Sequence, residues 1–300
     1  MMLELDEKKI RKGRPLGLPY KGSKKRISKK IIEIIKQNFG TEKPIYDIFG
    51  GGGAITAECL INGLEVHYND LDRTITDMFQ RVLATDREFL KTLIISREEF
   101  FKIRDKENKT IDDELKLLVN SFRNDRNTYL YSKEFSDLKY NLAVEIIKKH
   151  DTFSGYKKTD TYKNAYRPFD VGKEDKSQVL KQFQRIQPLE RVQKMSIKNL
   201  KITNHDYTHF SYLKNTIIYL DPPYENTILK GYSIKEFDSQ PFYDWAYEMS
   251  KKNIVLISSY EISDSRFECV YEFKNASINN YGEGRRARKE KLFMVKKGEE

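Results

Sequence analysis

The chain has 300 residues, enough for one large domain or two smaller ones, and 33% of them are charged. Its net charge of +10 favours a polyanionic partner such as nucleic acid. Its two cysteines, Cys59 and Cys269, lie far apart in the sequence, which argues against a disulfide framework and a structural zinc site, and we expect no metal. Without an apolar N-terminal segment or a run of about 18 apolar residues, we expect a cytoplasmic protein.

The N-terminal region begins with an irregular segment. Residues 1–19 are charged and then rich in glycine and proline, and they predict an arm that leads into the fold. The hydrophobic periodicity that follows predicts an amphipathic helix over 27–38. Ser28 is a candidate N-cap of this helix, and Gly40 is a candidate stop.

A strand–loop–helix–strand unit comes next. An apolar run predicts a strand over 44–49, and this strand leads directly into four glycines at 50–53. A helix is expected over 54–62 and a second strand over 64–70. Glycines at the first turn of such a unit are typical of nucleotide-binding α/β folds.

The composition and hydrophobic pattern of the sequence change between residues 75 and 196. This region is charged and helical, and the helical spacing of its apolar residues is clear over 179–195. Buried-strand patterns then return, at 200–203, 215–220 and 253–258, before a terminal antiparallel pair at 267–273 and 291–295. We therefore predict a discontinuous α/β domain over 1–74 and 197–300 with a mainly helical insertion over 75–196.

The tetrapeptide Asp221-Pro222-Pro223-Tyr224 ends the predicted strand 215–220. The two prolines cannot continue the sheet, because neither offers a backbone N–H. The turn therefore presents a carboxylate, an aromatic ring and proline carbonyls at the edge where open α/β sheets bind ligands. An acceptor pair beside a flat ring suits a planar base with an exocyclic amine. An ordinary strand-ending turn with a solvated aspartate is the alternative.

The glycines at 50–53 allow a ligand to approach the backbone closely. A dinucleotide fingerprint would need a third glycine where Ile55 or Thr56 stands, and a phosphate-binding loop would need a Gly-Lys-Ser/Thr ending. A glycine loop without phosphate machinery suits a nucleoside cofactor such as S-adenosylmethionine. A tight turn without a ligand is the alternative.

Acidic residues follow two further predicted strands. Asp70 is placed to accept hydrogen bonds from ribose hydroxyls, although Asp70 or Asp72 could instead be a helix N-cap. Asp206 and Tyr207 follow the strand at 200–203 and could hold the adenine of the cofactor, or could form a structural turn.

These motifs together resemble a known family. In chain order they are Tyr20-x-Gly-Ser-Lys24, Asp47-Ile-Phe49-Gly-Gly51-Gly-Gly53, Asn69-Asp70, His205-Asp206-Tyr207 and Asp221-Pro-Pro-Tyr224. From about residue 15 to 297 the chain resembles Dam-type DNA adenine-N6 methyltransferases, particularly their bacteriophage members. The resemblance implies a Rossmann-like, S-adenosylmethionine-dependent methyltransferase core with an inserted target-recognition domain.

The resemblance also implies roles for individual residues. Asp221 and the Pro222 carbonyl would hold the target amine, and Tyr224 would stack on the extruded base. The expected cofactor pocket contains Tyr20, Lys24, Asp47, Phe49, Gly51, Gly53, Asp70, Asp206, Tyr207 and Asp221. Ser23 and Tyr207 depart from the glycine and the phenylalanine that are common in the family.

Two basic segments are candidates for contacts with DNA. Arg123, Asn124, Arg126 and Asn127 are side chains suited to reading guanine and adenine, and their segment resembles the family's recognition hairpin. A polar surface loop is the alternative. Between the last two predicted strands, a basic loop that could bind phosphates contains Arg285, Arg286 and Arg288, unless it is merely solvated.

The sequence therefore predicts a monomeric, site-specific adenine-N6 methyltransferase of duplex DNA, of the kind found in restriction–modification systems and bacteriophages. An RNA adenine-N6 methyltransferase and a DNA-binding relative without catalysis are the alternatives. Protein-glutamine and cytosine-N4 methylation are less favoured, because related enzymes usually carry Asn or Ser where Asp221 stands.

Overall fold

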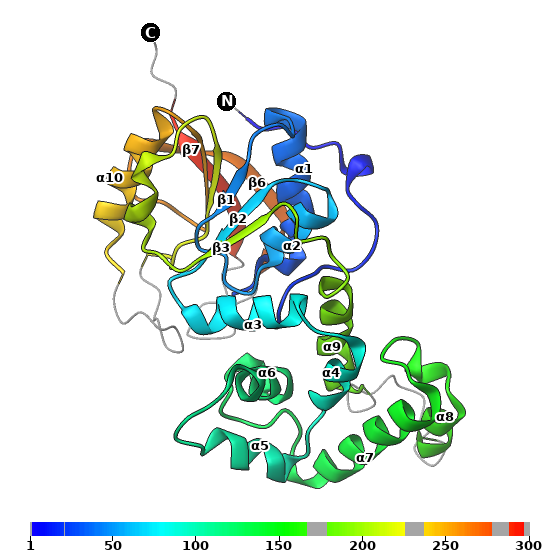
Figure 1. Ribbon diagram of the computed structural model, residues 1–300. Coiled ribbons are helices and arrows are strands. Elements are labelled where there is room, and N and C mark those ends of the chain that lie inside the picture. Colours follow the sequence, from blue (N-terminus) through cyan, green and yellow to red (C-terminus); the bar gives the residue numbers. More distant parts are fainter. Residues whose placement is uncertain (1, 21, 167–178, 226–236, 278–287, 297–300) are drawn as a thin grey trace. The chain divides into compact units, whose positions relative to one another are not determined.

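The computed structural model describes residues 2–20, 22–166, 179–225, 237–277 and 288–296 (Figure 1). The chain divides into two units. The first consists of Met1–Pro15, Lys24–Thr76 and Ser196–Glu300, and the second of Leu16–Ser23 and Asp77–Met195. The first unit is thus discontinuous, and the main segment of the second enters it shortly after its second strand.

A seven-stranded sheet forms the centre of the first unit in the described part of the chain. Its order is β3-β2-β1-β4-β5-β7-β6. The first five strands are parallel, and β7 runs antiparallel to both of its neighbours. The strands are β1 (Ile45–Asp47), β2 (Val66–Asn69), β3 (Leu200–Thr203), β4 (Ile217–Leu220), β5 (Ile254–Ser259), β6 (Phe267–Ser277) and β7 (Arg288–Val295). The predicted Rossmann-like α/β core is confirmed.

Helices cover both faces of this sheet (Figure 1). On one face, α10 (Ser239–Ser250) and the short η7 (Tyr207–Tyr212) pack against alternate apolar residues of β1, β4 and β5. On the other face lie α1 (Ser28–Phe39) and α2 (Ala54–Ile61). The two central strands are buried along their whole length, which explains why they read as continuous apolar runs rather than as alternating ones.

The start of α1 differs from the prediction. Ile27 occupies the cap position and Ser28 is the first helical residue, so Ser28 does not cap the helix; its hydroxyl donates to the Lys25 carbonyl. The cause is the short η2 (Lys24–Arg26), which leads almost directly into α1. Gly40 ends the helix with φ of +80°, as the sequence predicts.

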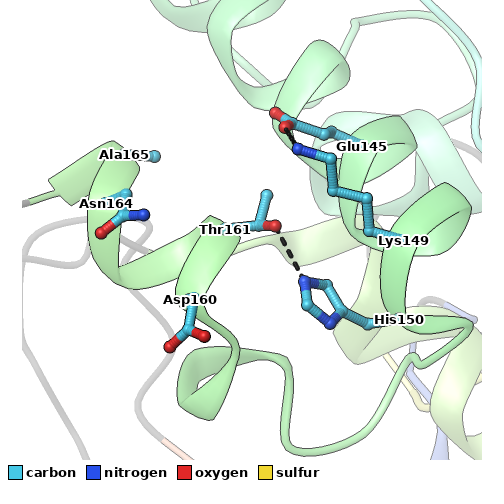
Figure 2. A pocket seen from close by; sticks show the side chains of 7 residues that line it. All are labelled: Glu145, Lys149, His150, Asp160, Thr161, Asn164 and Ala165. Carbon is cyan, nitrogen blue, oxygen red and sulfur yellow. Dashed lines mark hydrogen bonds and ion pairs between the residues drawn. The ribbon is translucent and has the colours of Figure 1, made fainter.

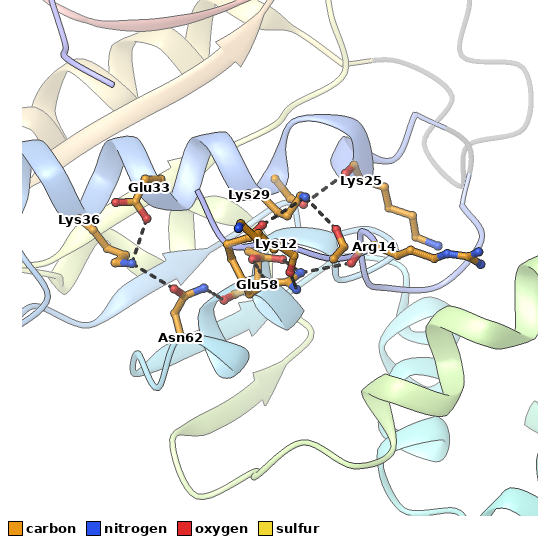
Figure 3. A network of polar contacts seen from close by, with 11 residues as sticks. Lys12, Arg14, Lys25, Lys29, Glu33, Lys36, Glu58 and Asn62 are labelled. Atoms are coloured by element: carbon orange, nitrogen blue, oxygen red, sulfur yellow. Dashed lines mark hydrogen bonds and ion pairs between the residues drawn. The ribbon is translucent and has the colours of Figure 1, made fainter. Parts of the chain in front are cut away.

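The N-terminal arm is bound to the first unit. The Leu3 N–H donates to the Val270 carbonyl of β6 at 2.8 Å. Further along, Arg11 forms a two-pronged ion pair with Glu58 of α2, and Lys29 Nζ donates to the Gly13 carbonyl (Figure 3). Polar contacts therefore fix the arm across α1 and α2.

The second unit is helical. The Ser121–Tyr129 bridge is its one β-type pairing within the described residues. Its helices are α3 (Arg73–Leu83, which begins in the first unit), α4 (Arg87–Thr92), α5 (Arg97–Arg104), α6 (Ile111–Asn120), α7 (Lys133–His150), α8 (Asp160–Tyr166) and α9 (Lys181–Val192). Thr110 and Asp113 form a reciprocal capping box at the start of α6. Figure 2 shows a polar surface hollow between α7 and α8, where His150 contacts Thr161.

Candidate active site at the end of β4

The tetrapeptide that begins with Asp221 follows β4 directly and lies at the carboxyl edge of the sheet. Its neighbouring strand β1 is paired with β4 in the register Asp47↔Tyr219 and leads into the glycines at 50–53. The strand order reverses between these two strands. Such a reversal is the place where open α/β sheets bind ligands.

A buried lysine occupies the centre of this edge. Lys24 Nζ lies 2.6 Å from Asp221 Oδ1 and 2.6 Å from the Tyr224 hydroxyl oxygen. It also lies 3.5 Å from Glu290 Oε1 of β7. The same Glu290 oxygen accepts hydrogen bonds from the Tyr224 hydroxyl and, at 3.0 Å, from the Ser258 hydroxyl of β5. The site therefore holds two carboxylates around one ammonium group.

The burial of these charges sets their proton affinities. Burial raises the pKa of Asp221 to about 6; Lys24 opposes this shift and Glu290 adds to it. For Lys24, burial acts to lower the pKa, but the two carboxylates outweigh it and the pKa is raised. At neutral pH Asp221 is therefore an ionised hydrogen-bond acceptor and Lys24 is a cation.

The glycine loop is shaped by an aromatic side chain of β2. A Cβ atom at Gly50 would lie 2.4 Å from two ring carbons of Tyr68, so only glycine fits there. The Tyr68 hydroxyl donates to the Gly51 carbonyl at 2.6 Å. Gly51 and Gly53 have φ of +46° and +67°, in the left-handed region. The loop is thus a tight, fixed turn into α2.

Two predicted cofactor residues also hold this turn. Asp70 Oδ2 accepts the Gly51 N–H at 2.8 Å, and its other oxygen accepts the Asp72 N–H. Asp72 in turn accepts the Thr74 N–H at the start of α3, so the helix-capping role falls to Asp72. Asp47 accepts both the backbone N–H and the hydroxyl of Thr56 in α2.

Burial also dominates the electrostatics of these two carboxyl groups. It raises the pKa of Asp47 to about 7 and that of Asp70 to about 6, against the hydrogen bonds that each accepts. The charge of Asp221 raises the pKa of Asp47 further. Asp47, Asp70 and Asp221 therefore share this edge of the sheet with Glu290, and a ligand with donor groups or positive charge would stabilise their ionised forms.

Asp206 and Tyr207 lie just beyond β3. Asp206 is exposed and caps η7, since its Oδ1 accepts the backbone N–H and the hydroxyl of Thr208. The half-buried Tyr207 ring stacks on Phe49 at a centroid distance of 6.1 Å and meets Trp245 edge-on at 5.1 Å. The structure thus joins Phe49 and Tyr207 in one aromatic cluster.

The remaining predicted site residues belong to the second unit or are described only in part or not at all. Tyr20 belongs to the second unit. Arg285 and Arg286 lie outside the described residues, and Arg288 is described only as the first residue of β7.

The predicted recognition segment forms a loop of the second unit between Ser121 and Tyr129. It contains three non-glycine residues with φ between +52° and +59°, namely Arg123, Asn124 and Arg126. Asp125 accepts the N–H of Asn127, and Arg126 pairs with Glu114 at 2.9 Å.

The comparison with protein families is decisive. A family model described as D12 class N6 adenine-specific DNA methyltransferase matches residues 20–283. The chain belongs to this family. The prediction of an adenine-specific methyltransferase family is confirmed, and the Dam-type and bacteriophage-like assignments stay predictions.

The solved structures that match this D12-class chain include two of low sequence identity. The presumed methyltransferase yhhF from Escherichia coli is 11% identical, with a TM-score of 0.34 and coverage of 95% of this chain and 92% of that chain. The presumed methylase HI0767 from Haemophilus influenzae is 9% identical, with a TM-score of 0.33 and coverage of 95% and 93%. No curated protein matches the chain at a significant level.

Two further features concern the described residues alone. Every helix among them is too short or too polar to cross a membrane. No three His, Cys, Asp or Glu side chains in this part of the chain converge in the manner of metal ligands.

Sequence reasoning missed three side chains at this site: Tyr68, Ser258 and Glu290. Glu290 had a detectable signal. In a strand, side chains two positions apart share a face, and Glu290 stands two positions from the fully buried Leu292. An acidic residue on a buried strand face needs a partner, but the basic run before it suggested a solvated or phosphate-binding loop.

Proposed function

We propose that this D12-class protein transfers the methyl group of S-adenosylmethionine to the N6 amine of an adenine extruded from duplex DNA. The observation that carries the proposal is the cluster at the end of β4. There the Asp221 carboxylate lies beside the Tyr224 ring and one strand away from the glycine loop. An ionised acceptor and an aromatic ring, in a largely water-excluded place, suit an amine on a planar base.

The acidic residues near the glycine loop fit this cofactor. Asp47 is buried and Asp70 half-buried, and the pKa values of both carboxyl groups are raised; such a site favours a ligand with positive charge and hydroxyl donors over a phosphate. Asp70 would hold the ribose, while Gly51 and Gly53 leave room for it. Tyr20, Lys24, Asp47, Phe49, Asp206, Tyr207 and Asp221 would complete the pocket. When bound, this cofactor supplies an electrophilic methyl group.

The reacting amine needs help from the protein, because its lone pair is delocalised into the adenine ring. Asp221 and the Pro222 carbonyl would each accept one of its two hydrogens. These two hydrogen bonds favour a pyramidal nitrogen and free its lone pair for attack on the methyl carbon. The electrons of the broken carbon–sulfur bond would stay on sulfur, and the amine would release its surplus proton toward Asp221 and solvent. Asp221 does not need to be a strong base, so that orientation and electrostatics supply most of the acceleration.

The target base must leave the duplex to reach this pocket, which costs about a few kcal/mol. Stacking on Tyr224 would offset part of that cost. The Tyr224 ring meets Tyr260 at a centroid distance of 4.8 Å, and Lys24 Nζ lies 5.0 Å from its centre. These contacts would hold the ring ready for the base.

We assign recognition of the DNA to the second unit, residues 75–196 in the predicted division. Its loop between Ser121 and Tyr129 would present Arg123, Asn124, Arg126 and Asn127 to base edges. The left-handed residues of that loop support a functional role, since such strain persists mainly where function requires it. Arg285, Arg286 and Arg288 would contact phosphates, which makes binding strongly dependent on salt.

The test is transfer of a labelled methyl group from S-adenosylmethionine to unmethylated duplex DNA, followed by nucleoside analysis. N6-methyladenine formed by the wild type but not by Asp221→Ala, with DNA affinity retained in the variant, is the expected result. Methylation of RNA alone would replace the proposal by an RNA methyltransferase. DNA binding without any transfer would replace it by a non-catalytic relative.

A further inference from the structure

Glu290 gives the site a second carboxylate that the proposed reaction does not use. Its Oε1 accepts from the Ser258 hydroxyl at 3.0 Å and from the Tyr224 hydroxyl, and it lies 3.5 Å from Lys24 Nζ. Its side chain is only 13% exposed. An acidic group buried to this degree requires donors or a cation, and this one has both.

Lys24 and the target amine need the same acceptor. Lys24 Nζ donates to Asp221 Oδ1 at 2.6 Å, the carboxylate that would receive the N6 amine of adenine. A carboxylate can accept more than one donor, so Lys24 need not leave Asp221 entirely, but its ammonium group occupies one oxygen and draws on the charge that the amine requires. A shift of Lys24 away from Asp221 would therefore strengthen the acceptor for the amine. Since the Lys24 side chain is 9% exposed, its ammonium group cannot turn to bulk water without another partner.

Glu290 is the acidic partner within reach. Lys24 Nζ lies 3.5 Å from Glu290 Oε1. A movement of roughly 0.5–0.7 Å would bring the two atoms to a normal hydrogen-bond distance. Glu290 itself is fixed by Ser258, and β5 and β7 are paired beside it in the register Ser258↔Leu292. The acceptor for the displaced ammonium is thus already in place.

We propose that Glu290 is a positioning residue that takes over the Lys24 ammonium when the target amine occupies Asp221, and that anchors the Tyr224 hydroxyl meanwhile. This inference rests on the proposed function. In a site with a single carboxylate, Lys24 would compete with the substrate amine throughout the reaction. With two carboxylates, the cation keeps an anionic partner in both states, and the exchange needs no exposure to water.

Glu290→Gln is the informative variant, because glutamine keeps the shape and can still accept the hydrogen bonds from Ser258 and Tyr224. Lys24 then has no anionic partner other than Asp221 among these residues. We expect kcat for DNA methylation to fall about 10- to 100-fold, with DNA affinity within about twofold of wild type.

The pH profile adds a readout that a merely structural role would not move. The charged and titratable groups that face Asp221 are Lys24, Asp47, Tyr219, Tyr224 and Glu290. Loss of the Glu290 charge removes a repulsion on the Asp221 carboxylate. The acidic limb of the kcat profile should therefore move to lower pH in Glu290→Gln, and should stay near its wild-type position in Glu290→Asp.

A double-mutant cycle with Lys24→Met identifies the partner. If Glu290 acts through Lys24, Glu290→Gln should change kcat by less than about twofold in the Lys24→Met background. The inference would be overturned if Glu290→Gln lowered kcat in the Lys24→Met background as much as it does in the wild type. It would also be overturned if Glu290→Gln left both kcat and the acidic limb of the pH profile at their wild-type values. Absence of methyl transfer by the wild-type protein would instead reject the proposed function. Thermal melts and Glu290→Asp separate these results from misfolding.

Discussion

Arg11→Ala should strongly destabilise the first unit. Arg11 Nε and Nη2 donate to the two carboxylate oxygens of Glu58 at 2.6 and 2.9 Å. The Glu58 side chain is 1% exposed, so the variant would leave a buried carboxylate without its cation (Figure 3). Breaking a buried ion pair from one side costs about 3–5 kcal/mol, which is a large fraction of the stability of a typical domain.

The single tryptophan makes this measurement specific to the first unit. Trp245 lies in α10, whose neighbours are η7 and β5, and its fluorescence will follow the unfolding of the sheet domain. A loss of about 3–5 kcal/mol in unfolding free energy should lower the urea midpoint by roughly 1–2 M. The slope of that free energy against urea concentration should change little. Circular dichroism at 222 nm, which senses the helices of both units, serves as the second probe.

The matched control is the double variant Arg11→Met, Glu58→Leu. An apolar pair of similar volume should recover most of the lost stability, because the cost arises from the orphaned charge and not from the missing contact. A midpoint for Arg11→Ala within about 0.2 M of wild type would refute the reasoning, since the Glu58 carboxylate would then be stabilised without Arg11.

Three further predictions concern the active site. The methylation rate should fall about tenfold per pH unit below about 6, because Asp221 must be ionised and its pKa is raised to about 6; a kcat profile between pH 5 and 8 checks this. Gly50→Ala should lower the free energy of unfolding by about 1–3 kcal/mol, because the added methyl group meets the Tyr68 ring. It should also weaken S-adenosylmethionine binding, which titration calorimetry measures. The control Gly63→Ala has open space around the added carbon within the described structure but a φ of +75°, so backbone strain should lower its folding stability while cofactor affinity stays unchanged. Tyr224→Phe should keep most of the capacity to hold an extruded base, whereas Tyr224→Ala should lower kcat/KM about 10- to 100-fold through lost stacking; equal losses in both variants would argue against a stacking role.

The strands of the sheet were predictable because their residues carry a local signal. β4 and β5 are short apolar runs with branched side chains, and both occur where the sequence predicts them. Helix ends were less predictable, because capping depends on the conformation that precedes the helix. Serine is a common N-cap residue, but the turn of η2 before α1 makes Ser28 the first residue inside the helix.

Of the candidate site, only the residues that belong to contiguous sequence motifs were predictable. Lys24, Asp221 and Tyr224 stand in such motifs, and the structure brings their side chains together. Glu290 joins them only because β7 lies beside β5, which is a long-range pairing. Asp70 illustrates the opposite limit: its position at the end of β2 is visible in the sequence, but its hydrogen bond to the Gly51 N–H is not. The cofactor and DNA roles of these residues stay predictions.

The interrupted sheet also has a consequence for biosynthesis. β1 and β2 leave the ribosome early, but β1 lacks its central neighbour β4 until the whole insertion has been made. Lys24 and Asp221 are 197 residues apart, which corresponds to roughly 10–40 s of translation at typical rates. During that interval the exposed edge of β1 is open to wrong pairing. The helical insertion, rich in local contacts, can fold meanwhile, so the charges of Lys24 and Asp221 meet last.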